Sequence, residues 1–319
     1  MHKPSHASLS AIQAHAAAAG RQPADPLRQP LTEARATASA YQEIWNAPLP
    51  PTGRIDDVVT ATGNRLTLFR PDGIGPSPVL FYFHGGGFVL NSVHGYRRIL
   101  RLLAQRSGAT IAALHYGLAP ELRFPGQLHQ ALDAVEWVLS HAAVLNLQSE
   151  RWAVAGDSAG ANLALAATLA RRDAGLALPD LSILFYGMFS ARLDTSSHQE
   201  YGGGAHGLTT QRVDWFWEQY LPSRTLRTHP LAAPLHADLA GLGRHLVVGA
   251  GLDCLLDDSL ALARGLKDAG THVTLTVEEG LPHSFLQANA ILPQADASIS
   301  RAASVMVHAL RGTLAQKAA

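Results

Sequence analysis

Residues 152–160 read Trp152-Ala153-Val154-Ala155-Gly156-Asp157-Ser158-Ala159-Gly160. The first four of these residues are apolar, as in a buried strand, and a helical segment, 159–171, follows directly. The pattern Gly-x-Ser-x-Gly between a strand and a helix is typical of a sharp turn that presents a nucleophilic serine. We therefore expect Ser158 to have a strained backbone at a helix N-terminus, where negative charge is favoured. The alternative is an ordinary strand–turn–helix junction.

On both sides of this turn, short apolar runs alternate with helix-length amphipathic segments. Strands that are apolar along their whole length predict a mostly parallel sheet with helices on both faces, an α/β architecture. The turn Thr62-Gly63-Asn64 predicts that the first two strands form a hairpin. The predicted strands are 54–60, 65–69, 79–83, 110–115, 152–155, 181–186, 245–248 and 273–277, and the predicted helices are 96–107, 127–141, 159–171, 259–269 and 297–310.

Two segments depart from the alternation. The first 50 residues are rich in Ala and Pro, with helices predicted at 10–19 and 31–45. After the strand at 181–186, residues 189–221 contain no strand signal. We therefore expect a core formed by residues 51–188 and 226–319, with segments 1–50 and 189–225 outside it.

Composition excludes several classes of function. Lys+Arg and Asp+Glu both count 25, so no basic excess would attract nucleic acid or an anionic membrane. The single cysteine, Cys254, excludes an intramolecular disulfide and a Cys-rich metal site. No run approaches the roughly 20 apolar residues of a membrane span. Gln13 and His15 interrupt the Ala-rich segment 11–20, which predicts a short helix in a cytoplasmic protein, with a signal peptide as the alternative.

A run of glycines follows the predicted strand 79–83, in the motif His84-Gly85-Gly86-Gly87. Glycines there let backbone N–H groups face a ligand with no side chain in the way. A flexible turn or a phosphate-binding loop is the alternative, but this glycine run does not fit the Gly-x-x-x-x-Gly-Lys or the Gly-x-Gly-x-x-Gly pattern. Such donors would stabilise the oxyanion of a tetrahedral intermediate. The predicted oxyanion hole consists of the N–H groups of Gly85, Gly86, Gly87 and Ala159.

A nucleophilic serine needs a base, and the base needs an orienting acid. Asp253 follows the strand 245–248 and should lie at the same edge of the sheet as Ser158. Asp257 and Asp258 stand at the start of the next helix, where capping is the expected role. His283 follows the last predicted strand, and the order Ser, Asp, His is that of α/β-hydrolases. We therefore predict Ser158 as nucleophile, Asp253 as acid and His283 as base.

These roles predict acyl transfer. His283 would take the Ser158 hydroxyl proton as that oxygen attacks a carbonyl, while Asp253 fixes the imidazole tautomer. An acyl-enzyme would form and then be hydrolysed by water. The reaction needs no metal and no organic cofactor, and a His-Glu-x-x-His motif is absent.

With these residues assembled, the chain resembles the bacterial hormone-sensitive-lipase-like family of α/β-hydrolases. That family pairs a His-Gly-Gly-Gly motif with a Gly-Asp-Ser-Ala-Gly motif, which this chain matches at His84–Gly87 and Gly156–Gly160. Between the two motifs the family carries a segment like Tyr116–Pro125. It also has an Asp-Pro-Leu motif, matched here at Asp253 and Leu255, and a later histidine at the position of His283. The similarity to the family extends from about Tyr41 to Leu310. Within the family, the bacterial acetyl esterases are the most similar in two segments, residues 202–221 and 253–259. Three departures are Cys254 in place of proline, Gly117 in place of arginine and Ser284 in place of glycine.

The resemblance implies that segments 1–50 and 189–225 pack together as a helical cap over Ser158. The aromatic run 214–220 in the second segment would then form a wall of the substrate pocket. The alternative is that Val213, Phe216, Trp217 and Tyr220 are the buried stripe of a cap helix. The residues predicted to line the pocket are Phe88, Asp157, Trp215, Phe216 and Leu255.

The leading hypothesis is a serine carboxylesterase for short-acyl esters. The same triad would serve an amidase, an aryl-formamidase or a lactonase, so these remain alternatives. A catalytically inactive small-molecule receptor is a third hypothesis, although such relatives have typically lost the histidine that His283 provides here. We expect a small-molecule ester as the partner, no nucleic acid or membrane, and a monomer or homodimer.

Overall fold

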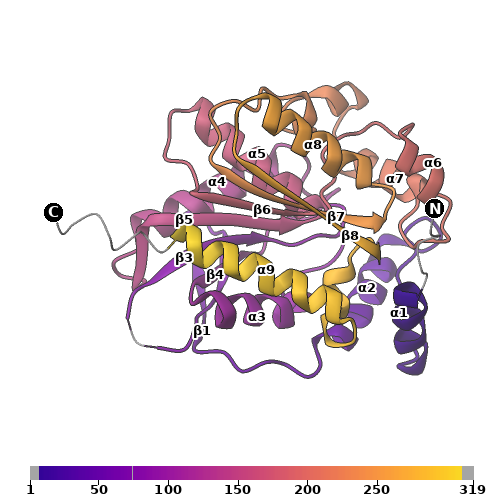
Figure 1. Ribbon diagram of the computed structural model, residues 1–319, viewed down its shortest axis with the longest axis horizontal. Coiled ribbons are helices and arrows are strands. Elements are labelled where there is room, and N and C mark those ends of the chain that lie inside the picture. The colour runs from indigo at the N-terminus through magenta and orange to yellow at the C-terminus, as the bar shows by residue number, and fades with distance from the viewer. Residues whose placement is uncertain (1–6, 74, 311–319) are drawn as a thin grey trace.

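An eight-stranded sheet runs through residues 7–73 and 75–310, which the computed structural model describes (Figure 1). Its strand order is β1-β2-β4-β3-β5-β6-β7-β8. β2 is antiparallel to both neighbours and the other pairs are parallel, which confirms the predicted hairpin and the mostly parallel sheet. The strands are β1 (Ile55–Val59), β2 (Arg65–Phe69), β3 (Ser77–Phe83), β4 (Thr110–Leu114), β5 (Leu147–Asp157), β6 (Leu181–Phe185), β7 (Arg244–Leu252) and β8 (Val273–Pro282).

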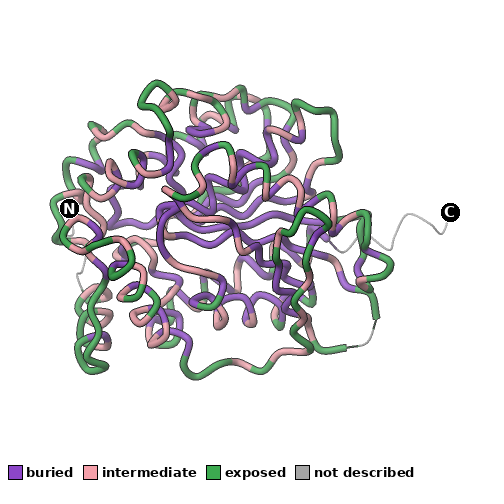
Figure 2. The backbone as a smooth tube through the Cα atoms, turned by 180° about the vertical axis from the view of Figure 1, so that it is seen from behind, coloured by how far each residue is buried: buried purple, intermediate pink, exposed green. Residues whose placement is uncertain are grey.

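Helices cover both faces of the sheet. α4, α5 and α8 lie on one face and α3 and α9 on the other, and the inner strands between them are mostly buried (Figures 1 and 2). The stripe Leu100, Leu103 and Ala104 of α3 is buried because residues three and four apart share one face of a helix. The helices are α1 (Ala7–Ala18), α2 (Leu31–Asn46), η1 (Val93–Tyr96), α3 (Arg97–Ser107), α4 (Gly126–Ser140), α5 (Ala159–Asp173), α6 (Ser196–Tyr201), α7 (Thr210–Tyr220), η2 (Arg224–Thr228), η3 (Pro234–His236), α8 (Leu256–Asp268), η4 (Phe285–Ala290) and α9 (Pro293–Leu310).

Several elements extend beyond their predicted ends. β5 begins at Leu147 rather than Trp152, and β8 continues past residue 277 to Pro282. α8 and α9 begin at Leu256 and Pro293, ahead of the predicted starts at 259 and 297. The added residues are mostly polar or partly exposed. Apolar patterning detects only the buried part of an element, so these ends were not predicted.

The two non-alternating segments are helical where the structure describes them. α1 and α2 come from the first 50 residues, and α6 and α7 from the insertion between β6 and β7, which contains no strand. Figure 1 shows all four at one end of the sheet. Residues 1–6 and 311–319 of the predicted ranges lie outside the described residues. Within the described ranges, no helix is both long and apolar enough to cross a membrane.

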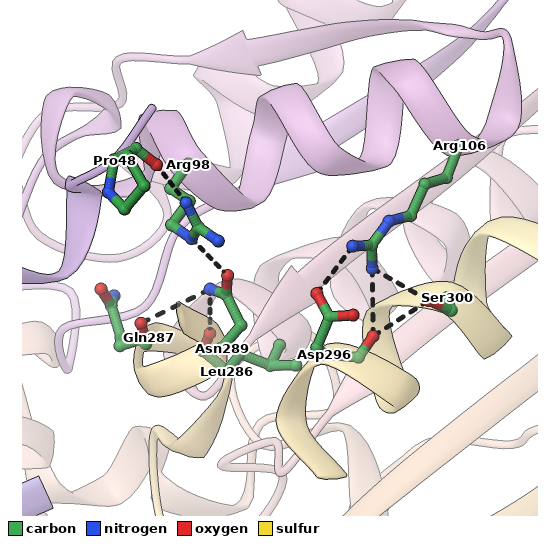
Figure 3. Close-up of polar contacts among 8 residues, drawn as sticks. All are labelled: Pro48, Arg98, Arg106, Leu286, Gln287, Asn289, Asp296 and Ser300. Atoms are coloured by element: carbon green, nitrogen blue, oxygen red, sulfur yellow. Dashed lines mark hydrogen bonds and ion pairs between the residues drawn. The ribbon is translucent and has the colours of Figure 1, made fainter. Parts of the chain in front are cut away.

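Polar contacts fix the chain that follows the last strand against α3. Arg98 Nε donates to Asn289 Oδ1 at 2.7 Å, and Arg106 Nη2 lies 2.7 Å from Asp296 Oδ1 (Figure 3). Asn289 belongs to η4, which begins shortly after His283. These contacts therefore hold in place the loop that carries the predicted base.

Candidate active site

The turn between β5 and α5 holds Ser158 in an unusual backbone conformation, with φ 54° and ψ −121°. Such a conformation is costly for a residue with a side chain, and it persists only where its surroundings enforce it. Here the chain passes very close to itself. A Cβ atom on Gly160 would lie 1.9 Å from the Phe83 carbonyl oxygen, and one on Gly156 would lie 2.3 Å from the Gly160 carbonyl carbon. The predicted strained turn is present, and only glycines fit at these two positions.

Two side chains from later loops meet at Ser158. His283 Nε2 lies 3.0 Å from Ser158 Oγ, and His283 Nδ1 lies 2.6 Å from Asp253 Oδ2. Asp253 is 1% exposed, so its carboxylate is shielded from water. Because Asp253 accepts at Nδ1, we assign the proton of the neutral imidazole to Nδ1, which leaves Nε2 to accept from the serine hydroxyl. The structure thus brings the three predicted residues together in the geometry of a nucleophile, a base and an orienting acid.

The two other aspartates near Asp253 bind the insertion. Asp258 Oδ2 accepts the N–H groups of Phe189 and Ser190, both at 2.8 Å, and Asp257 Oδ2 accepts the N–H of Ser197 at 2.9 Å. The residue that precedes α8 makes no side-chain capping hydrogen bond. The prediction that Asp257 and Asp258 cap this helix is wrong, because their oxygens bind backbone from another segment.

Three backbone N–H groups near Ser158 are available to a ligand. No hydrogen bond among the described residues uses the N–H of Gly86, Gly87 or Ala159. The N–H of Gly85, in contrast, donates to Asp157 Oδ1 at 2.9 Å. Tyr96 Oη also lies 3.1 Å from the same nitrogen, so the single proton of Gly85 is directed at these two buried oxygens and not at an oxyanion. The predicted contribution of Gly85 is therefore corrected, and the predicted donors that make no hydrogen bond to a described residue are those of Gly86, Gly87 and Ala159.

Asp157 lies beneath the glycine run and is fully buried. Tyr82 Oη donates to Asp157 Oδ1 and Tyr96 Oη donates to Oδ2, both at 2.9 Å. The Gly85 N–H donates to the same carboxylate, so three protein donors occupy its oxygens and none is exposed to a substrate. The prediction that Asp157 lines the pocket is thus corrected: its carboxylate joins the turn of Ser158 to the glycine run.

Two substitutions at Asp157 are expected to differ sharply in stability. Asp157→Ala leaves three buried donors without their acceptor, and we expect a loss of about 3 kcal/mol or more in the free energy of unfolding. Asp157→Asn keeps Oδ1 for Tyr82 and Gly85, and its new amide can donate to the Tyr96 hydroxyl. At pH 7 we expect it to cost less than about 1 kcal/mol. Urea unfolding of both variants measures this difference, and equal losses would contradict the assigned hydrogen bonds.

The stability contribution of Asp157 should also depend on pH. Burial raises the pKa of the Asp157 carboxyl to about 6. The hydrogen bonds from Tyr96, Tyr82 and Gly85 favour the charged form and so lower the pKa, but the effect of burial is larger. A raised pKa means that the folded protein binds the proton more tightly than the unfolded chain, so the stabilisation is present at low pH and is lost as the pH rises through about 6. We expect the unfolding free energy of the wild type, relative to Asp157→Asn, to fall by about 2 kcal/mol from pH 4 to pH 7. A difference that rises with pH would contradict this assignment.

A cavity of about 250 Å³ opens onto Ser158 and His283. Both non-alternating segments contribute to its wall, although they are far apart in the sequence. From α2 come Tyr41, Gln42 and Trp45, and from the insertion come Leu208, Arg212 and Phe216. Among the described residues, no group of three or more His, Cys, Asp or Glu side chains is arranged to hold a metal ion.

Of the five residues predicted to line the pocket, only Phe216 does so. Phe88 is buried, with its ring stacked on Tyr220 at a centroid separation of 3.7 Å, and Leu255 is buried in the core. Trp215 does not line the cavity, and its ring makes an edge contact with Phe216 at a centroid separation of 5.5 Å. The alternative prediction for this helix is confirmed, because its buried residues are Val213, Phe216, Trp217 and Tyr220.

Sequence reasoning missed most of the cavity wall. Gln42 and Trp45 of α2 and Arg212 of α7 were assigned no role, although a helix was predicted at 31–45 and the resemblance implied a cap. Side chains from two distant segments meet here, and no local pattern records such a contact. The one available signal was a polar residue, Gln42, at a position that helical spacing places among apolar neighbours.

Comparison with known proteins agrees with this fold. The sequence profile of a family described as alpha/beta hydrolase fold matches residues 80–287. An ethyl acetate hydrolase from Pseudomonas putida is 36% identical over 247 residues, 75% of this chain and 77% of the relative. An acetyl esterase from Salmonella schwarzengrund is 32% identical over 260 residues, 80% of each chain.

Solved structures of esterases share the fold. A thermostable esterase from Pseudomonas putida superimposes with a TM-score of 0.88 at 29% identity, covering 95% of this chain and 98% of that one. An esterase from Pyrobaculum calidifontis gives a TM-score of 0.85 at 32% identity, covering 88% and 94%. Sheet and site together define an α/β-hydrolase with a Ser–His–Asp constellation. The chain belongs to the hormone-sensitive-lipase-like family of this fold, which confirms the resemblance drawn from its motifs.

Proposed function

We propose that the protein is a serine carboxylesterase that hydrolyses short-acyl esters. The observation that carries the proposal is the alignment of Ser158 Oγ, the His283 imidazole and Asp253 at 3.0 Å and 2.6 Å. The relatives named as an acetyl esterase and an ethyl acetate hydrolase support the choice of substrate class.

The arrangement of these groups gives the reaction its order. His283 Nε2 accepts the Ser158 proton as Oγ attacks the ester carbonyl, and Asp253 stabilises the imidazolium that results. The carbonyl oxygen becomes an oxyanion within reach of the N–H groups of Gly86, Gly87 and Ala159, at the N-terminus of α5. His283 then protonates the departing alcohol, and water attacks the acyl-enzyme by the same steps in reverse.

We also propose that segments 1–50 and 189–225 form a cap over a core of residues 51–188 and 226–319. The cavity supports this proposal, because α2 and α7 both line it above Ser158. A volume of about 250 Å³ suits a small ester better than a long acyl chain. A cytoplasmic location and a monomer or homodimer belong to the same proposal and rest on the sequence alone.

Initial rates on three substrates test the reaction class: p-nitrophenyl acetate, p-nitrophenyl octanoate and an acyl anilide. We expect the acetate to be hydrolysed fastest and the anilide slowest, because the small cavity limits the acyl chain and an amide is the less reactive carbonyl. Negligible acetate turnover beside fast anilide cleavage would overturn the esterase proposal in favour of an amidase.

A further inference from the structure

Arg212 of α7 brings a guanidinium group to the wall of the cavity that contains Ser158 and His283. Its Nε atom is shielded from solvent and makes no hydrogen bond, and no acceptor among the described residues pairs with the rest of its side chain. A guanidinium N–H that is shielded from water without an acceptor costs free energy. The position of Arg212 therefore favours a ligand that supplies an anion.

The surroundings of Arg212 do not neutralise its charge. The Phe216 ring lies 6.0 Å from the guanidinium carbon, which gives a weak attraction but no hydrogen-bond acceptor. Burial lowers the pKa of Arg212, and the Asp25 carboxylate opposes this from a distance. That carboxylate is already engaged, by the Leu27 N–H at 3.2 Å and by Arg28 at 3.5 Å. None of the described residues that line the cavity is Asp or Glu.

The same cavity holds a second unpaired polar side chain. Gln42 of α2 lines it and is 4% exposed, yet neither its Oε1 nor its Nε2 has a hydrogen-bond partner among the described residues. Buried amides are rarely left unpaired in folded proteins. Two helices from separate segments thus each present an unsatisfied hydrogen-bonding group to one cavity, beside the serine and the histidine.

We propose that this cavity binds esters that carry a carboxylate group, and that Arg212 selects them. The inference rests on the proposed esterase function and names its substrate class. A Cβ atom on Gly87 would lie 2.2 Å from the Phe216 ring, so that ring packs against the glycine run. Arg212 precedes Phe216 by four residues of α7, an axial rise of roughly 6 Å. The carboxylate that Arg212 holds lies in the same cavity as the reacting carbonyl, and it is bound without taking part in the chemistry.

Two kinds of ester carry a carboxylate close to the ester bond. Half-esters of a short dicarboxylic acid have the charge on the acyl side, and acetylated short hydroxy acids have it on the alcohol side. Each has a neutral isostere in which an amide replaces the carboxylate. The matched pairs are monoethyl succinate with ethyl succinamate, and β-acetoxypropionate with β-acetoxypropionamide. The pair that shows the larger acid preference identifies the side of the cavity that Arg212 occupies.

The experiment measures kcat/KM for both pairs in the wild type, Arg212→Gln, Arg212→Lys and Arg192→Gln. Arg192 is exposed and paired with Asp194, so its variant controls for net charge. We expect the wild type to prefer the acid of at least one pair, and this ratio to fall about 10- to 100-fold in Arg212→Gln. Arg212→Lys should keep part of the acid preference, because lysine retains the positive charge but lacks the planar guanidinium that donates two parallel hydrogen bonds to a carboxylate. Arg192→Gln should keep all of it.

No acid preference in the wild type, or equal losses on acid and amide in Arg212→Gln, would overturn the role of Arg212 while leaving esterase activity intact. Failure of the wild type to hydrolyse any of these esters, with ethyl acetate as an additional neutral substrate, would overturn the proposed function itself. The two failures are therefore distinguishable.

Discussion

Replacing either Ser158 or His283 with alanine is expected to lower kcat for p-nitrophenyl acetate by about 10⁴- to 10⁶-fold. The reason is the 3.0 Å contact between Ser158 Oγ and His283 Nε2, since each group is ineffective without the other. The double variant should therefore be nearly as active as either single variant. Initial rates under saturating substrate measure all three.

The matched control is His272→Ala, because His272 is exposed and stands just before β8, at the opposite edge of the sheet from His283. We expect it to keep its rate within about two-fold. If the fold-loss in kcat of the double variant equalled the product of the two single losses, Ser158 and His283 would act independently. That result would contradict the assigned roles.

Gly160→Ala is expected to destabilise the protein by at least about 3 kcal/mol, although alanine is ordinarily the better residue in a helix by about 1 kcal/mol. The new Cβ would lie 1.9 Å from the Phe83 carbonyl oxygen and 2.6 Å from that of His84. Both are backbone atoms at the end of β3, so neither can move aside without displacing the strand or the glycine run. Urea unfolding measures the loss, and weak expression would be consistent with it.

Gly203→Ala provides the comparison, because no atom lies within 4 Å of its added Cβ. We expect a change within about 0.5 kcal/mol. If Gly160→Ala were as well tolerated as Gly203→Ala, the close approach of α5 to β3 would be contradicted, and with it the reason for the strained turn at Ser158.

The sequence was most informative where chemistry follows the ends of strands. Ser158, Asp253 and His283 each come shortly after a predicted strand, and parallel strands bring such positions to one edge of the sheet. Chain order leaves His272, His283 and His308 after Asp253, and only His283 lies in the loop that follows the last predicted strand. The fold was predictable because β3 to β7 are apolar through most of their length, as expected of parallel strands that are buried on both faces.

The roles of Gly85 and Asp157 were not predictable, because they depend on hydrogen bonds between distant segments. Asp157 looks like a pocket residue beside Ser158, and only Tyr82 and Tyr96 beneath it show that its carboxylate is fully used. Phe88 was misplaced in a similar way, since its stacking partner Tyr220 lies in the insertion. Contacts of this kind leave no periodic signal in the sequence.

Labelling with an organophosphonate tests most directly whether Ser158 is an activated nucleophile. We expect one equivalent of label on the peptide that contains Ser158, with activity lost in proportion, and no label in Ser158→Ala. Buried Cys254 should stay unmodified, since burial raises the pKa of its thiol and shields it from the reagent. A wild-type protein that resists labelling, or that is labelled elsewhere while its activity persists, would contradict the catalytic role of Ser158 and favour a non-catalytic small-molecule receptor.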